Sequence, residues 1–69
     1  MDENWILLLA SGEQHQIQIF KSMLESNQIP AIILNKQDSA YLAFGDIELY
    51  VPRDKFVQAR YLIDRSSND

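Results

Sequence analysis

The sequence predicts a single α+β domain, an open sandwich in which two helices cover one face of a mostly antiparallel sheet. Three observations support this class. The runs Trp5–Ala10 and Ala31–Leu34 are short and apolar on both alternations, as in strands buried on both faces. The stretches 12–26 and 53–63 repeat apolar residues at helical spacing. Ile47–Val51 alternates apolar and polar side chains, as a half-buried strand does.

The first helix follows the first strand directly. Ser11 and Gln14 have the spacing of a capping box, which predicts that the helix begins at about Gly12. We expect it to end near Ser26-Asn27, because Pro30 follows and cannot continue a helix. The apolar residues on one side of this helix are expected to form a buried stripe of Ile17, Ile19, Phe20, Met23 and Leu24.

The rest of the chain predicts a hairpin and a second helix. Gly45-Asp46 separates Ala40–Phe44 from Ile47–Val51, and Gly at the first position of a two-residue loop fits a type II′ turn. The second helix begins at 52–54, where Asp54 is favoured by the positive helix end. Its core stripe is predicted to be Phe56, Ala59, Leu62 and Ile63, with Val57 and Tyr61 on nearly the opposite side.

The order of these elements predicts the topology. A right-handed crossover through the first helix makes the first two strands parallel and puts the hairpin return between or beside them. This is a ferredoxin-like open sandwich, β-α-β-β(-β)-α, with two helices on one face and the final strand missing.

Composition limits the chain to one domain. It has 69 residues, 46% of them hydrophobic, so we expect a single domain over 1–69 with its core in 5–63 and a polar tail at 66–69. There is no cysteine, which excludes a disulfide framework and a thiolate zinc site. Stability must therefore come from the apolar core, from a partner chain, or from both.

Charge and hydropathy narrow the expected partners. Ten acidic residues against six basic ones give a net charge of −4, which argues against a nucleic-acid partner. No apolar run approaches the roughly 18 residues of a membrane span. The first apolar run has no basic segment before it, so we expect no signal peptide and a cytoplasmic location.

Few residues suit catalysis or metal binding. His15 is the only histidine, and its position opposite the apolar stripe predicts an ordinary exposed side chain. Asp46 and Glu48 share a strand face beside Tyr50, a spacing that suits paired carboxylates, although a solvated strand face has the same pattern. We therefore expect no catalytic site, metal or cofactor.

A weak candidate site for an anion or small ligand combines two helix starts. Ser11 and Gly12 precede the first helix, where free N–H groups accept anions, although helix capping is the commoner role. Arg53 and Lys55 form a basic spot near the start of the second helix, although interleaved acids favour a solvated helix face.

The strongest anomaly is a surplus of apolar surface. Strict alternation puts Trp5, Leu7 and Leu9 on one face of the first strand and Ile6, Leu8 and Ala10 on the other. Two helices cover only one sheet face, so we expect self-association, edge to edge or face to face. The alternative is a tight monomer in which the hairpin folds over the second face. The predicted interface residues are Trp5, Tyr41, Phe44, Tyr50, Val57 and Tyr61.

Two segments resemble a family of small prokaryotic signal-transducing proteins whose function is uncharacterised, within the PII-like, ferredoxin-like superfamily. Phe20–Ala31 is similar to the family's segment Leu-Leu-Glu-x-x-Gly-Ile-Pro-Ala, and Leu49–Ile63 is similar to its strand end Leu-x-Val-Pro and the following helix. Gln28 stands where the family usually has Gly, so Asn27 or Gln28 must take the left-handed conformation.

The resemblance implies a ferredoxin-like fold and a role in signal transduction rather than catalysis. It supplies no site residues, and Asn35–Ser39 is too short to replace the nucleotide-binding loop of the PII-like regulators. We therefore predict a non-enzymatic regulatory or protein-interaction module. Its expected partner is a second copy, most simply in a homodimer, or another cytoplasmic protein. The alternative is a sensor that binds a small metabolite at a subunit interface.

Overall fold

The chain forms a small α+β domain, as predicted. A computed structural model describes residues 4–35 and 47–67. The elements in chain order are β1 (Trp5–Ser11), α1 (Gln14–Ser26), β2 (Ile32–Asn35), β3 (Ile47–Pro52), the 3₁₀ turn η1 (Arg53–Lys55) and α2 (Phe56–Ser67).

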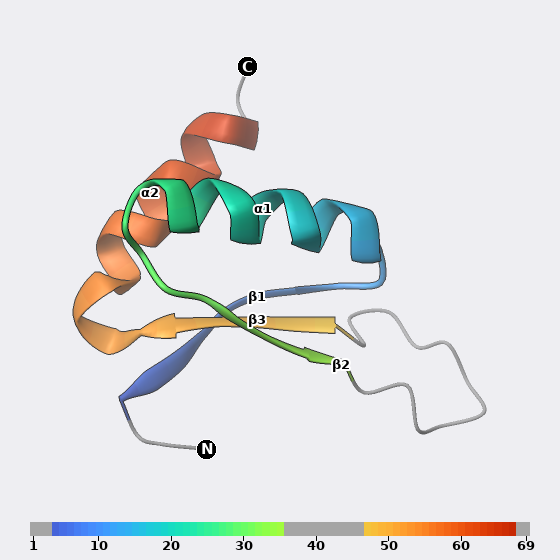
Figure 1. Ribbon diagram of the computed structural model, residues 1–69, viewed down its shortest axis with the longest axis horizontal. Coiled ribbons are helices and arrows are strands. Elements are labelled where there is room, and N and C mark those ends of the chain that lie inside the picture. Colours follow the sequence, from blue (N-terminus) through green and yellow to red (C-terminus); the bar gives the residue numbers. More distant parts are fainter. Residues whose placement is uncertain (1–3, 36–46, 68–69) are drawn as a thin grey trace.

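The three strands form one sheet in the order β1-β3-β2. Because β3 runs antiparallel to both neighbours, β1 and β2 are parallel to each other, as the expected crossover requires. Both helices lie on the same side of this sheet (Figure 1). The strand and turn predicted over 40–46 lie outside the described residues.

A β-bulge divides β1 into two parts. The pairing with β3 shifts between Leu7 and Leu9, so that Leu9 lies opposite the fully buried Leu49. Ala10 lies opposite Glu48 instead. The prediction that Leu9 shares a face with Leu7 was therefore wrong, because one extra residue reverses the alternation beyond the bulge.

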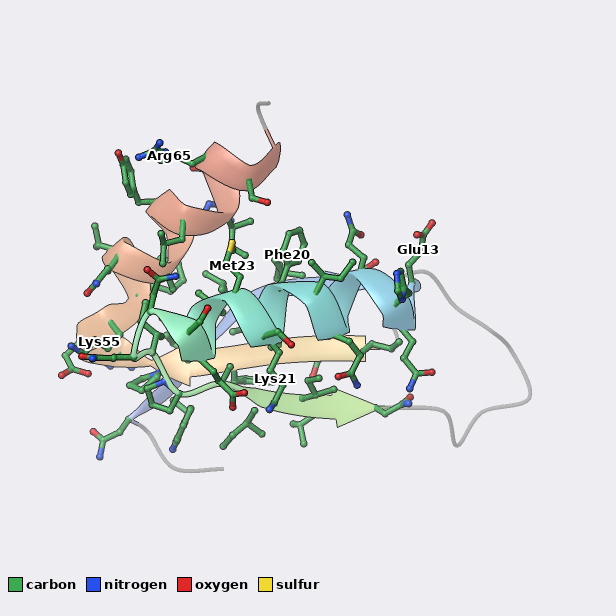
Figure 2. All side chains as sticks on the ribbon, turned by 45° about the horizontal axis from the view of Figure 1, so that its top comes forward. Glu13, Phe20, Lys21, Met23, Lys55 and Arg65 are labelled. Atoms are coloured by element: carbon green, nitrogen blue, oxygen red, sulfur yellow. The ribbon has the colours of Figure 1, made fainter. Side chains whose placement is uncertain are left out.

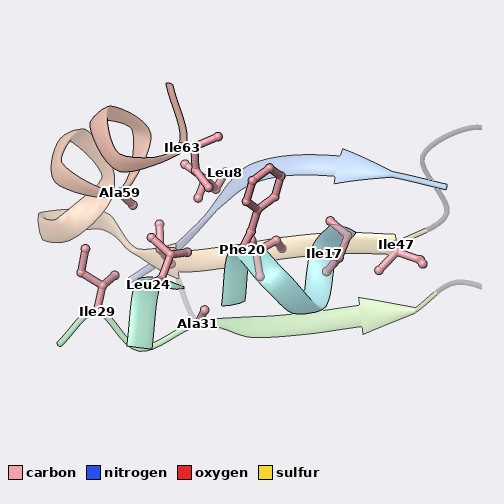
Figure 3. Packing of buried hydrophobic residues seen from close by; sticks show 11 residues of the cluster. Leu8, Ile17, Phe20, Leu24, Ile29, Ala31, Ile47, Ala59 and Ile63 are labelled. Carbon is pink, nitrogen blue, oxygen red and sulfur yellow. The ribbon is translucent and has the colours of Figure 1, made fainter. Parts of the chain in front are cut away.

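The core lies between the sheet and the two helices. Figure 3 shows Ile63 of α2 beside Leu8 of β1, with Leu24 and Phe20 of α1 also directed into this layer. Its buried members come from β1 and β3, from both helices and from the segment between α1 and β2: Leu8, Ile17, Phe20, Leu24, Ile29, Ala31, Ile47, Leu49, Val51, Ala59 and Ile63. From β2, Ile33 packs against this cluster with part of its surface exposed.

The predicted helix stripes are largely correct. Ile17, Phe20 and Leu24 are buried as expected, and Met23 packs against the core with part of its surface exposed. Ile19 is an exception at 51% exposed, because it lies at the margin of the stripe, beyond the width that the sheet and α2 cover. In α2, Ala59 and Ile63 are buried, while Phe56 and Leu62 pack partly exposed against the same cluster.

The start of α1 differs from the predicted capping box. The helix begins at Gln14, and its N-cap residue is Glu13, which makes no capping hydrogen bond through its side chain. Ser11 belongs to β1, and its Oγ accepts a hydrogen bond from the backbone N–H of Glu13 at 3.0 Å. The hydroxyl therefore stabilises the turn between strand and helix, and it also donates to Gln16 Oε1 in the first turn at 3.5 Å.

The end of α1 is a Schellman motif. Gln28 has φ 66°, so the left-handed position falls on one of the two residues predicted for it. The N–H of Ile29 donates to Leu24 O at 2.9 Å, and the N–H of Gln28 donates to Glu25 O at 3.1 Å. Ile29 and Leu24 are both fully buried, which completes the apolar contact of this motif.

The last helix is longer than predicted. It is preceded by the 3₁₀ turn η1, whose first residue follows Pro52, and it continues to Ser67. It thus includes Ser66 and Ser67, the first two residues of the expected polar tail at 66–69.

Candidate interaction surface

The side of the sheet away from the helices forms the candidate functional surface, which we call the open face. Cross-strand register and burial place eight side chains on it: Trp5, Leu7, Ala10, Ile32, Leu34, Glu48, Tyr50 and Pro52. Among the described residues, no helix or strand packs against this side (Figure 1).

An apolar row crosses the middle of the open face. Leu7 of β1 and Ile32 of β2 both lie directly opposite Tyr50 of β3, which places the three side chains side by side. Leu7 is 42% exposed, and the other two are partly buried. The hydroxyl of Tyr50 donates a hydrogen bond to Glu48 Oε1 at 3.0 Å. The row thus presents aliphatic and aromatic surface beside one acidic group.

The structure divides the predicted interface residues between two surfaces. Trp5 and Tyr50 lie on the open face, whereas Val57 and Tyr61 lie on the solvent side of α2 with exposures of 81% and 58%. There, Arg65 Nη1 donates to the hydroxyl of Tyr61 at 3.4 Å, and its guanidinium lies 5.8 Å from the ring centre. Tyr41 and Phe44 lie outside the described residues.

The two halves of the predicted anion site lie at opposite ends of the sheet. Ser11 pairs with Ile47 at one end of the ladder, whereas Arg53 and Lys55 follow the other end of β3. Figure 2 shows the same separation, with Glu13 at the start of α1 and Lys55 below α2 on the far side. Any ligand sites there are separate.

A hollow lies near the second of these positions. It has a volume of about 520 Å³ and is lined by Asn4, Arg53 and Asp54. The backbone N–H of Arg53 donates to Asn4 O at 2.7 Å, which joins the start of β1 to the end of β3. The hollow therefore combines a guanidinium, an amide and a carboxylate at one corner of the sheet.

The structure does not bring the residues considered for catalysis together. His15 is exposed on the first turn of α1, on the helix side, while Glu48 faces the opposite side of the sheet. Asp46 lies outside the described residues. Over 4–35 and 47–67, no three His, Cys, Asp or Glu side chains are grouped as a metal site would need. No helix in these ranges is both long and apolar enough to cross a membrane.

Sequence reasoning missed Leu7 and Ile32 as members of the candidate surface. Both come from strands that are apolar on both faces, so composition does not distinguish core side chains from open-face ones. Their alignment with Tyr50 depends on the pairing register, which places them in one row.

The chain matches no protein-family model, no curated protein and no solved structure with which it was compared.

Proposed function

We propose that this chain is a small, non-enzymatic protein-interaction module with a regulatory role in the cytoplasm, and that it works as a homodimer. The observation that carries the proposal is the open face, where an apolar row of Leu7, Tyr50 and Ile32 has no cover among the described elements. Apolar patches of this kind on small domains commonly mark contact surfaces.

The arrangement of the elements supports the regulatory assignment. Over the described residues, the strand order β1-β3-β2, with helices after β1 and β3, is compatible with the proposed ferredoxin-like arrangement. The left-handed Gln28 stands at the position where the signal-transducing family usually has Gly. Both features agree with the resemblance, which implies signal transduction rather than catalysis.

Of the two apolar surfaces, the open face is the better candidate for the contact. It offers Trp5, Leu7 and Tyr50 together, and large apolar and aromatic side chains dominate binding energy at interfaces. The exposed side of α2 offers only Val57 and Tyr61, and Tyr61 already interacts with the charged Arg65.

Two matched variants test this assignment. Leu7→Lys and Val57→Lys each put one positive charge on an exposed aliphatic position, the first on the open face and the second on α2. Sedimentation at micromolar concentration should give about 16 kDa for the unchanged chain and for Val57→Lys, twice the 8.0 kDa of one chain. Leu7→Lys should be monomeric, because the contact would bury an unpaired charge.

The same measurement can reject the proposal. An 8.0 kDa species alone, at all concentrations of the unchanged chain, excludes the homodimer. If Val57→Lys disrupts the dimer and Leu7→Lys does not, the contact surface lies on α2 instead of the open face. Circular dichroism of both variants checks that each remains folded.

The hollow at the sheet corner favours a second candidate function, a sensor for a small metabolite. Its volume of about 520 Å³ falls in the range of small-molecule sites, and its described lining, Asn4, Arg53 and Asp54, is polar. A thermal-shift screen with nucleotides and amino acids tests this function, because a ligand that binds the folded chain raises its unfolding midpoint. Unchanged midpoints exclude those ligands.

A further inference from the structure

The position of β1 identifies how two copies would meet; this inference rests on the proposed homodimer. In the order β1-β3-β2, one side of β1 pairs with β3 and the other forms an edge of the sheet (Figure 3). Among the described residues, no strand pairs with this outer side. Such an edge presents backbone N–H and C=O groups that another strand can pair with.

The hydrogen-bond pattern indicates which residues of β1 direct their backbone N–H and C=O groups away from β3. The N–H of Arg53 donates to Asn4 O, so this pair is a hydrogen-bonded pair of the antiparallel ladder. Since such pairs alternate, Ile6 also bonds to β3, whereas the N–H and C=O groups of Trp5 and Leu7 point away from it. Pro52, which lies opposite Trp5 and has no N–H, fits this alternation.

The side chains of β1 suit a second copy of the same acidic chain. From Trp5 to Ser11 the strand has no ionisable residue and no proline, although the chain has a net charge of −4. Two copies can therefore approach here without placing like charges opposite each other. The other edge strand, β2, is only four residues long and follows Pro30, so it offers a shorter pairing.

We propose that two copies of the chain pair antiparallel through β1, about a two-fold axis at Ile6. In this register Trp5 lies opposite Leu7 of the partner subunit, and Leu7 lies opposite the partner's Trp5. Both residues have outward backbone groups, so each such pair forms two hydrogen bonds. The contact is self-complementary, as a two-fold interface requires.

The pairing also joins the two open faces. The side chains of Trp5 and Leu7 lie on this face, and a hydrogen-bonded antiparallel pair brings Cα atoms to about 5.5 Å. Four apolar side chains, two from each copy, then meet across the axis. The apolar row continues from Ile32 and Tyr50 of one copy through Leu7 to the same residues of the other.

Hydrogen exchange of the unchanged chain tests this geometry directly. Backbone amide exchange is followed by NMR at concentrations below and above dimerisation. If the edges pair, the amides of Trp5 and Leu7 exchange about tenfold more slowly where nine-tenths of the chains are paired, since exchange then passes through the remaining monomer. The amide of Ile6, which the alternation directs to β3 in either state, should be protected already in the monomer, unlike those of Trp5 and Leu7.

The outcomes separate this inference from the proposed function. A dimer in which the amides of Trp5 and Leu7 exchange at the monomer rate overturns the edge pairing and leaves the homodimer intact. A chain that stays monomeric at every concentration overturns both, and an extended segment of another protein then becomes the candidate occupant of the edge.

A pair of variants at Leu7 tests the edge pairing independently of hydrogen exchange. Leu7→Pro removes the outward N–H without removing a donor to β3, whereas Leu7→Ala shortens the side chain and keeps that N–H. Edge pairing predicts a much larger rise in the dissociation constant for Leu7→Pro than for Leu7→Ala. Equal effects in folded variants contradict it, and the exchange experiment stands if Leu7→Pro does not fold.

Discussion

Replacing Gln28 with glycine should stabilise the protein. Gln28 holds the left-handed position of the Schellman motif with φ 66°, and its side chain is exposed. A non-glycine residue in this conformation costs about 1–2 kcal/mol. Glycine avoids that cost, but its greater freedom in the unfolded chain reduces the gain in stability by about 0.5–1 kcal/mol. The net gain in the free energy of unfolding is therefore about 0.5–1 kcal/mol.

The assay is urea and thermal unfolding, followed by circular dichroism at one fixed protein concentration, since association also changes the apparent stability. For a domain of this size the gain corresponds to a rise in Tm of about 2–8 °C. Gln18→Gly is the matched control, because Gln18 is an exposed residue inside α1. Replacing Gln18 with glycine should lower the free energy of unfolding by about 0.5–1 kcal/mol.

The two substitutions should therefore differ in sign. If Gln28→Gly lowers the stability as Gln18→Gly does, the left-handed conformation is not the source of strain at the end of α1. An unchanged m-value in both variants is needed to treat the shifts in midpoint as changes in the free energy of unfolding.

Two further substitutions follow from the packing and charges of α1. Ile17→Val should lower the free energy of unfolding by about 0.5–1.5 kcal/mol, because Ile17 is fully buried. Ile19→Val, at a half-exposed position, should change it by less than about 0.5 kcal/mol. Equal losses in urea unfolding would contradict the burial assigned to the two residues. Lys21→Gln removes the exposed 2.8 Å ion pair with Glu25 and should change the free energy of unfolding by no more than about 0.5 kcal/mol. A larger, salt-sensitive loss would show that this ion pair contributes more to stability than an ordinary surface salt bridge.

Much of the fold could be predicted because the apolar patterns are local. The alternation Ile47, Leu49 and Val51 identifies the buried side of β3, and all three are buried. The left-handed residue before Ile29 was expected from the resemblance, which places Gln28 where the family usually has Gly.

The parts that sequence did not predict depend on contacts between distant residues. No local signal distinguishes a regular strand from one with a bulge in an unbroken apolar run, so the positions of Leu9 and Ala10 were assigned to the wrong faces. The spacing of Ser11 and Gln14 suits a capping box, yet pairing with Ile47 extends β1 through Ser11 and delays the helix. In both cases the pairing of β1 with β3 determines the local structure.

The candidate surface was predictable in kind but not in composition. An excess of apolar residues indicates a contact surface, and aromatic side chains were the natural members to choose. Only the register shows that Trp5 and Tyr50 share a face that Val57 and Tyr61 do not reach. The same register adds Leu7, whose exposure of 42% makes it the most accessible large aliphatic group on that face.

The bulge in β1 has a consequence for the size of any assembly. A long, uncharged edge strand is a template for open-ended aggregation, because each added chain leaves a new edge. The shift between Leu7 and Leu9 twists the strand and breaks its regular spacing of hydrogen-bonding groups, so a neighbour can follow it only over its first residues. In the proposed dimer, the extra residue thus confines the pairing to the part of β1 before the bulge, and the rest of this apolar edge does not serve as a regular template for a further strand.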